Sequence, residues 1–407
     1  MKSMVNPMGV YASPSCCLLS HDGNIPDRNG VSERNGCPAM NLMDLILQSI
    51  DSAIVQQRAD GSFPGGHNGP YRDVETPVRN TAHWLFAIAR AYRLTGINRY
   101  HVAGEAALGY LFSTAARPMG ATFFCRRNPN KDFSNGLIGQ AWVVEALLEA
   151  AVAFDHSEAV DLAFSTISLH PFDQKRRLWL RVNVDGSWSG IDNTFNHQLW
   201  FASAVALVLE LHSSPAINED LERFLGWVGG GGLRVSNAGR IIHHIPHPST
   251  TVRSLRCVNR TLSPLRSMQE IKRLRHKEIG YHAFNMYAFG ILRSVRNDLG
   301  LWGSAQFQKA LRFLLSRQYE SGLRCNKYGY PYNPAGFEAA YTLSQFPGLL
   351  GAKTDEHVRR FVERQFEFGW DRDTRMLTKN RDDRLTAAAR LYEVVRLPKL
   401  DFQLFNI

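Results

Sequence analysis

The sequence predicts an all-α fold, an (α/α)6 barrel of six helical hairpins, with short β-hairpins on one rim. A unit made of a polar loop, an apolar helix and an amphipathic helix recurs six times along the 407 residues. The third interval is the longest, and it contains a basic insertion at about 240–277. A single hairpin cannot bury its own apolar face, so the repeats should pack on one another, and their length favours a closed ring over an open solenoid.

We expect residues 1–40 to form a flexible N-terminal tail and residues 41–407 to form one toroid domain. The chain from Asp22 to Asn41 is rich in Gly, Asn, Pro and Ser and has no apolar periodicity. The apolar stretches near the N-terminus fall short of a secretory h-region, and no run of about 18 apolar residues is free of charges, so we expect neither a signal peptide nor a transmembrane span. The sequence therefore predicts a cytoplasmic protein that is soluble or bound peripherally to a membrane.

The predicted inner helices are rich in Ala and Gly and apolar on more than one side, as in helices surrounded by neighbours. They begin near Glu75, Asn135, Asn193, Lys277, Asn333 and Arg381. The predicted outer helices carry one charged face and span 41–58, 98–113, 156–169, 218–228, 305–319 and 354–368. The predicted β segments are short, at 178–184 and 233–245.

The sequence lacks the motifs of several common classes of site. Its six cysteines show no C-x-x-C spacing, so neither zinc nor disulfides are predicted, and no metal or cofactor is expected. P-loop, zincin and nucleophile-elbow motifs are missing. The net charge of +10 suits an acidic sugar or an anionic membrane surface. Aromatic residues are not interleaved with the basic cluster, so no nucleic acid is expected.

Polar residues gather in the first turns of the predicted inner helices, which places a pocket at one mouth of the ring. Free N–H groups at helix N-termini favour anionic ligands there. His197 and His282 each lie within a turn of a helix start, and imidazole transfers protons near neutral pH, so both are candidate catalytic residues. The candidate substrate-binding residues are Asn68, Tyr71, His83, Gln140, Asp192, Trp200, Tyr281, Asn285, Arg324 and Tyr332.

Some of these polar residues also have structural interpretations. Arg79 can pair with Glu75 at a spacing of four, and His83 can be a satisfied core histidine. Glu338 on an apolar helix is either a catalytic group or the buried partner of an arginine. Asp382 or Asp383 can cap the last helix. The second unit supplies Arg126, Asn135 and Trp142 without an obvious base, which indicates binding rather than reaction.

Six segments carry a family resemblance from about Asp60 to about Val395. They include GHNGPYRDVETPVRNTAHW, TFNHQLWFA, KEIGYHAFNMYAF and NPAGFEAAY, and they resemble the VpsJ-like bacterial polysaccharide biosynthesis proteins. That family looks like a branch of the six-hairpin toroids with N-acylglucosamine 2-epimerases and unsaturated glucuronyl hydrolases. The resemblance implies a sugar or glycan substrate from capsule or exopolysaccharide synthesis. It also implies that Arg79 and Glu338 assist two catalytic histidines. The net charge and the basic insertion add the expectation that this substrate is acidic or lipid-linked.

Three functions remain open from the sequence. The first is an epimerase or lyase that moves a proton beside a sugar carbonyl or carboxylate. The second is an inverting glycoside hydrolase that pairs Glu338 with Asp192 or Glu75. The third is a non-catalytic glycan-binding component of polysaccharide assembly, with its basic insertion on anionic lipid-linked intermediates.

Overall fold

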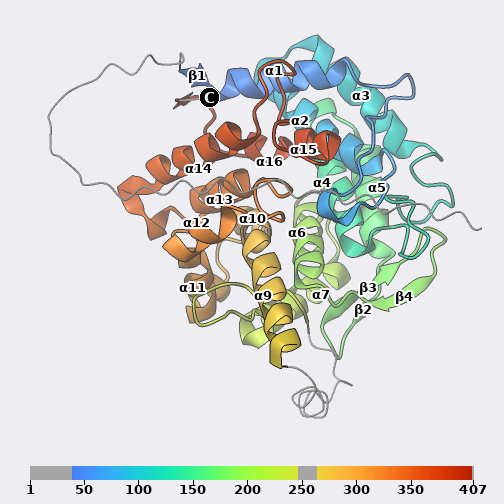
Figure 1. Ribbon diagram of the computed structural model, residues 1–407. Coiled ribbons are helices and arrows are strands. Elements are labelled where there is room, and N and C mark those ends of the chain that lie inside the picture. Colours follow the sequence, from blue (N-terminus) through green and yellow to red (C-terminus); the bar gives the residue numbers. More distant parts are fainter. Residues whose placement is uncertain (1–38, 246–263, 406–407) are drawn as a thin grey trace, which may run out of the picture. The chain divides into compact units, whose positions relative to one another are not determined.

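The computed structural model describes residues 39–245 and 264–405, which belong to one compact unit (Figure 1). This unit is predominantly helical, and its inner helices form a closed ring, which confirms the predicted fold class. Of the predicted tail, residues 1–40, only the last two are described. The middle of the predicted basic insertion, residues 246–263, also lies outside the described part of the chain.

The inner ring contains the most apolar helices of the chain. It consists of α2 (Val78–Thr95), α4 (Gly136–Phe154), α6 (Phe195–Leu211), α10 (His282–Val295), α13 (Ala335–Gln345) and the short pair α15 (Arg384–Ala389) and α16 (Tyr392–Val395). Each helix packs on the next, and α15 and α16 pack back on α2. Leu85, Val143 and Val205 in their middle turns are 0% exposed, as expected for helices with neighbours on all sides.

The outer helices cover the ring. They are α1 (Leu42–Ile54), α3 (Asn98–Phe112), α5 (Ser157–Ser168), α7 (Pro215–Trp227), α11 (Ala305–Phe313), α12 (Arg317–Leu323) and α14 (Thr354–Gly369). Short turns of other helix types are η1 (Gly69–Tyr71), η2 (Val228–Gly232), η3 (Gly300–Gly303), η4 (Pro347–Leu349) and η5 (Gly351–Lys353). The predicted helix at 305–319 is interrupted because Ser316 caps α12 by accepting a hydrogen bond from the backbone N–H of Tyr319.

Two small antiparallel sheets complete the fold. β1 (Met40–Asn41) pairs with β5 (Gln403–Leu404), which joins the two ends of the described chain (Figure 1). β2 (Phe172–Asp173), β3 (Leu178–Val182) and β4 (Trp188–Ile191) form the second sheet. β4 leads directly into α6, so this sheet positions the start of an inner helix. The predicted strand at 233–245 is reduced to isolated bridges, Val235 with Ile241 and Thr194 with His244.

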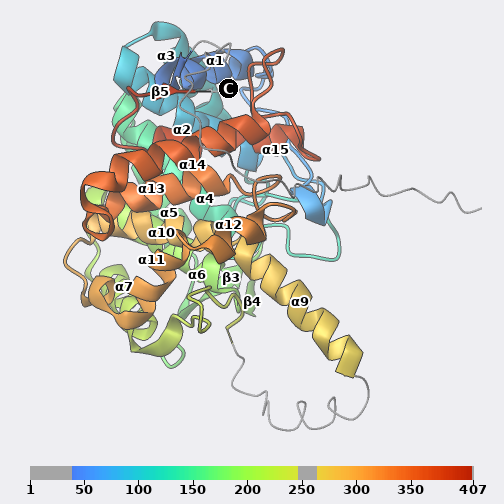
Figure 2. The same cartoon turned by 60° about the vertical axis from the view of Figure 1, so that its left-hand side comes forward.

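The fourth inner helix begins later than predicted. The sequence placed its start at Lys277, but Lys277 belongs to a separate helix, α9 (Pro264–Gly280), and α10 starts at His282. The backbone of Tyr281 leaves the helical region between them, with φ −98° and ψ 3°. Figure 2 shows α9 projecting from the ring as an arm.

Within the described residues, α4 is long and apolar enough to cross a membrane. However, 78% of that apolar window is buried against other parts of the protein. Its apolar character is therefore explained by its place in the inner ring.

Candidate functional site

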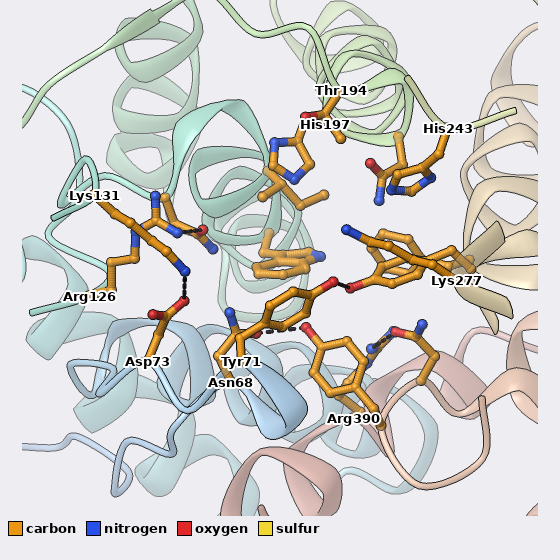
Figure 3. A pocket seen from close by; sticks show the side chains of 18 residues that line it. Asn68, Tyr71, Asp73, Arg126, Lys131, Thr194, His197, His243, Lys277 and Arg390 are labelled. Atoms are coloured by element: carbon orange, nitrogen blue, oxygen red, sulfur yellow. Dashed lines mark hydrogen bonds and ion pairs between the residues drawn. The ribbon is translucent and has the colours of Figure 1, made fainter. Parts of the chain in front are cut away.

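A pocket of about 190 Å³ opens at the end of the ring where the inner helices begin (Figure 3). Its lining residues are Asn68, Tyr71, Asp73, Arg126, Lys131, Asn135, Ile138, Trp142, Thr194, Asn196, His197, His243, Lys277, Tyr281, Phe284, Tyr332, Asn333 and Arg390. This volume is smaller than the roughly 300–1,000 Å³ that is typical of sites for drug-sized ligands. The pocket therefore fits one small polar ring better than it fits an extended ligand.

Larger hollows exist elsewhere. One of 480 Å³ lies beside α14 and is lined largely by apolar residues such as Val358, Leu397 and Phe402. Another of 560 Å³ is lined by charged side chains such as Glu367, Asp371 and Lys379, but by no histidine. The smaller pocket combines two imidazoles with cationic side chains at the helix starts, so it is the candidate site.

His197 is held in the pocket by a buried carboxylate. Asp192 follows β4, and its Oδ2 lies 2.8 Å from Nδ1 of His197 on the first turn of α6. Its other oxygen accepts a hydrogen bond from the backbone N–H of Thr194. Burial alone would raise the pKa of Asp192, but His197 and Arg181 lower it to about 2. A carboxylate can only accept here, so Nδ1 of His197 donates, and in the neutral form of the imidazole the lone pair is therefore on Nε2.

Gly136 leaves the space for this pair. It is the first residue of α4 and has φ +59°, which side chains rarely adopt. A Cβ at this position would lie only 2.7 Å from Oδ2 of Asp192 and 3.6 Å from Nδ1 of His197. Glycine therefore lets the carboxylate lie against the start of α4.

His243 is the second imidazole of the pocket, and it comes from the segment predicted as a basic insertion. Its backbone C=O accepts from the N–H of Phe195, and the N–H of Ile245 donates to Asn193, so the segment is fastened to the start of α6. Its ring lies 4.9 Å from the Tyr281 ring. Burial, followed by Lys277, lowers the pKa of His243 to about 3. At neutral pH this imidazole is therefore uncharged.

Three polar atoms of the lining have no hydrogen-bond partner in the described part of the chain. They are Nδ1 of His243, Oδ1 of Asn196 and Nε1 of Trp142. Buried polar groups normally find partners, so these atoms are free to bind a polar ligand or water.

Positive charge outweighs negative charge around the pocket. Nζ of Lys131 lies 2.6 Å from Oδ2 of Asp73, and Arg126 pairs with Asp132 at 2.7 Å. Lys277 differs from these two, since it has no ion-pair partner within residues 39–245 and 264–405. Its Nζ lies 5.4 Å from the ring centre of Tyr71. Burial and neighbouring cations lower the pKa of Lys277.

Hydroxyl groups form another side of the pocket. The hydroxyls of Tyr71 and Tyr281 lie 2.7 Å apart, and the Tyr332 hydroxyl donates to Oδ1 of Asn68 at 2.6 Å (Figure 3). Burial raises the pKa of both Tyr71 and Tyr281, so their hydroxyls stay protonated. Oxygen and nitrogen donors beside aromatic faces are the usual partners of a sugar ring.

Arg390 reaches the pocket from a buried charged cluster. It donates to Glu338 at 2.7 Å, to Asn333 at 2.6 Å and to Glu393, and all four side chains are at most 1% exposed. Burial raises the pKa of Glu338 well above normal and that of Glu393 to about 7. Glu338 thus lies behind Arg390 and does not line the pocket, contrary to its prediction as a catalytic residue; its carboxylate is instead the buried partner of an arginine, the alternative that the sequence left open.

Arg79 and His83 also lie behind the lining residues. Arg79 pairs with Glu75 at 3.0 Å, donates to Asn68 and is 2% exposed. His83 stacks on Tyr392 with ring centres 4.3 Å apart, and burial lowers its pKa well below normal. Both residues therefore have structural partners, and Arg79 acts on the pocket through the lining residues Asn68 and Trp142, whose ring centre lies 4.2 Å from its guanidinium carbon.

His282 does not reach the pocket, contrary to the sequence prediction. It is 0% exposed, its Nδ1 accepts from the backbone N–H of Ile241, and its Nε2 lies 3.0 Å from the C=O of Ala310. Burial lowers its pKa to about 3. His282 does lie in the first turn of α10, but that turn packs under the segment that carries His243, so the imidazole is covered rather than presented to the pocket.

The other predicted binding residues divide into two groups. Asn68, Tyr71, Tyr281 and Tyr332 line the pocket, and Asp192 supports His197. Four residues lie elsewhere. Gln140 binds the backbone of Phe123, and Trp200 donates to the C=O of Phe284. Asn285 donates to the C=O of Tyr281, and Arg324 is exposed. Long polar side chains on inner helices often satisfy backbone groups of neighbouring loops, which the sequence alone cannot distinguish.

Sequence reasoning missed five titratable lining residues, Asp73, Lys131, His243, Lys277 and Arg390. His243 and Lys277 were noticed only as members of the basic cluster. One feature of the sequence could have identified His243 and Lys277 as site residues. They lie at the two ends of a cluster that is poor in acidic residues, and each end is close to a helix start. Among the described residues, no three His, Cys, Asp or Glu side chains form a group that could hold a metal ion.

The fold matches solved sugar-processing enzymes over most of their length. D-mannose isomerase superimposes with a TM-score of 0.62 at 13% identity and covers 87% of this chain and 95% of its own. Cellobiose 2-epimerase from Bacillus thermoamylovorans gives 0.59 at 11% identity, covering 87% and 98%. An α-1,6-mannanase of Salegentibacter in complex with mannotriose gives 0.54 at 12% identity, covering 87% and 98%. The chain thus has the (α/α)6 toroid fold of sugar epimerases and glycoside hydrolases.

Sequence similarity identifies a narrower group. The chain is 38% identical over 377 residues to archaeal glycosylation protein Q of Haloferax volcanii, with 90% of this chain and 99% of that protein covered. It belongs to the same family as that protein. No model of a protein family matches the sequence.

Proposed function

We propose that this protein is a sugar isomerase or epimerase that acts on an anionic sugar used in glycan assembly. One observation carries the proposal. His197, oriented by Asp192, and His243, with an unpartnered ring nitrogen, both line one pocket at the mouth of the ring. In this proposal His243 takes the place that the sequence assigned to His282.

The two imidazoles supply the acid and base for proton transfer. Nε2 of His197 takes the proton from the carbon beside the sugar carbonyl, and the electrons of that C–H bond form the double bond of an enediolate. The carbonyl oxygen receives the negative charge, which Lys277 and the tyrosine hydroxyls stabilise. In isomerisation His197 returns this proton to the neighbouring carbon. In epimerisation His197 keeps it, and the opposite face receives a proton from His243, which has first become an imidazolium by taking up a proton from solvent as the anionic sugar offsets the charge of Lys277. Atoms and charge balance without any co-reactant.

The charge of the lining favours an anionic sugar. Four cationic side chains, Arg126, Lys131, Lys277 and Arg390, face one carboxylate, Asp73. An acidic group, whether carboxylate or phosphate, can therefore pair with Lys277 without displacing an existing ion pair.

The comparisons support the same general class. Two of the solved neighbours are named as a mannose isomerase and a cellobiose epimerase, and the relative is named as a glycosylation protein. Glycan assembly is consequently the process we propose for this chain. The narrower assignments to VpsJ-like proteins and to capsule or exopolysaccharide synthesis remain predictions.

Hydrolysis is supported less well by this geometry. An inverting hydrolase needs two carboxylates about 6.5–9.5 Å apart, one on each side of the bond to be cut. The pocket is lined by one carboxylate, Asp73, which pairs with Lys131, while Asp192 is bonded to His197. Glu338 and Glu75 are buried beside arginines. A purely glycan-binding role would use the same pocket without turnover.

Deuterium exchange separates these functions. In D2O, proton transfer introduces deuterium at the carbon beside the carbonyl of uronic acids, hexose phosphates or neutral hexoses, which NMR detects. His197→Gln and His243→Gln should abolish the exchange, whereas His244→Gln, the adjacent exposed residue, should not. Release of free sugar from oligosaccharides without exchange would identify a hydrolase, and ligand binding without either reaction would identify a binding protein.

A further inference from the structure

The arm formed by α9 has a long surface without a partner in the described part of the chain. Only its C-terminal end packs on the body, against α10 and α12. The helix extends away from the body (Figure 2), and the side chains from Met268 to Arg275 are all exposed. The apolar face of this projecting helix is not buried against the described part of the chain, so it is available to a partner.

Three large apolar side chains lie on this exposed surface. Met268 is 56% exposed, Ile271 is 63% exposed and Leu274 is 46% exposed. Successive positions three residues apart are rotated by about 60° on a helix, so the three form one stripe. Single exposed apolar residues are ordinary, but a contiguous stripe on a projecting helix marks an interaction surface.

Basic side chains accompany the stripe. Lys272 is exposed beside it, and Arg275 is exposed within it, in a direction between those of Met268 and Ile271. Arg273 is also exposed but pairs with Glu270 at 2.6 Å. At the base of the helix, Glu278 pairs with Arg240 at 2.7 Å. Apolar residues on one side and Lys or Arg beside them are the features of a helix that lies in the interface of an anionic bilayer.

The spacing argues against a second copy of the chain as the partner. A two-helix seam needs apolar residues at alternating intervals of three and four. After Met268 and Ile271, the next seam position is occupied by Arg275, whose charge would be buried between the helices. On a membrane the same arginine can extend its guanidinium to the phosphate layer while its stem lies among the lipid chains.

We propose that α9 docks this protein on the surface of an anionic lipid bilayer through Met268, Ile271 and Leu274, with Lys272 and Arg275 on the headgroups. The docked helix ends at the pocket, because Lys277 near its C-terminal end lines that pocket. If the proposed function also holds, docking brings the pocket close to sugars carried on membrane lipids. The docking itself does not depend on the reaction.

Vesicle flotation tests the proposal with the full chain. The protein should float with vesicles of phosphatidylcholine mixed with phosphatidylglycerol, should stay behind with phosphatidylcholine alone, and should be released as salt rises. Ile271→Asp/Leu274→Asp and Lys272→Glu/Arg275→Glu should each lower the bound fraction at least roughly tenfold. The matched controls are Val102→Asp, an exposed apolar residue of α3, and Lys175→Glu/Lys353→Glu, and both should bind like the wild type.

Three results would overturn the proposal. They are no binding to anionic vesicles, equal binding to neutral vesicles, and binding that the α9 variants leave unchanged. Sedimentation without lipid adds a further check, since a wild-type dimer that Ile271→Asp/Leu274→Asp converts to monomer would show that the stripe is a protein interface. Turnover of a soluble sugar, assayed in parallel, should be the same in all variants. Failure of docking is thereby distinguishable from failure of the proposed function.

Discussion

Oδ2 of Asp192 lies 2.8 Å from Nδ1 of His197, at the point where a small β-sheet leads into an inner helix. The carboxylate is 6% exposed and the imidazole 27% exposed, so one partner is fixed in the protein while the other reaches into the pocket. This is the arrangement of a base whose tautomer and orientation are set by a buried acid.

Replacing Asp192 with Asn should remove most of the activity without removing the histidine. The amide can present its N–H group to Nδ1, which favours the tautomer with the proton on Nε2 and leaves no base in the pocket. We expect kcat for deuterium exchange to fall about a hundredfold or more, with a small change in KM. The control is Asp161→Asn on the exposed face of α5, and a full loss of function there would point to a general effect of charge.

Gly136→Ala should damage the same pair sterically. The new Cβ would lie 2.7 Å from Oδ2 of Asp192 in a backbone conformation with φ +59°. We expect a loss of about 1–2 kcal/mol in the free energy of unfolding together with reduced kcat. Gly109→Ala on α3, where nothing lies within 4 Å, should keep both properties. Unchanged kcat in the Gly136 variant would show that the Asp192–His197 contact adapts.

His282 and His243 should respond differently to substitution. His282→Ala leaves the N–H of Ile241 and the C=O of Ala310 unpaired inside the protein, so it should lower the free energy of unfolding by about 1–3 kcal/mol. His243→Gln should change the midpoint of thermal unfolding little while abolishing exchange. Calorimetry measures the thermal unfolding of both variants, and NMR measures their deuterium exchange. A stable, inactive His282 variant would restore the original prediction for that residue.

Acidification should destabilise the fold through its buried histidines. The pKa values of His170, His243 and His282 are lowered to about 4, 3 and 3, so the unfolded chain binds more protons than the folded chain below about pH 6.5. The three histidines therefore make their full contribution to the free energy of unfolding above about pH 6.5, and this contribution is lost as the pH falls toward 3. Glu393, with its pKa raised to about 7, acts in the opposite direction and loses its contribution as the pH rises from about 4.5 to 7. Urea titrations should show that His282→Phe weakens the loss of stability between pH 6.5 and 4.

The charge of Lys277 should control the protonation of His243. After burial, Lys277 is the largest cause of the lowered pKa of His243, so Lys277→Met should raise that pKa. An anionic ligand that neutralises Lys277 should have the same effect on the wild type, which would then take up protons on binding. NMR titration of the imidazole signals measures the first effect, and calorimetry in buffers of different ionisation enthalpy measures the second. A neutral sugar should produce no uptake, and equal uptake with both ligands would contradict this coupling.

The sequence by itself determined the ring and its polar mouth. Six apolar helices alternating with amphipathic ones can bury their faces only by packing on neighbours, and their polar first turns place a pocket at one end. His197, Asp192, Asn68 and the three tyrosines were accessible to that reasoning because each lies within a short distance of a predicted helix start.

Only the tertiary structure decided which histidine meets His197. Helical periodicity places His282 in a first turn, but whether that turn faces the pocket or the outer layer depends on how α10 packs against the segment that ends at Ile245. His243 reaches the pocket through long-range backbone pairs with residues at the start of α6, and no local pattern encodes such pairs. Local spacing determines the helices, whereas burial and long-range hydrogen bonds select the side chains that they present to a ligand.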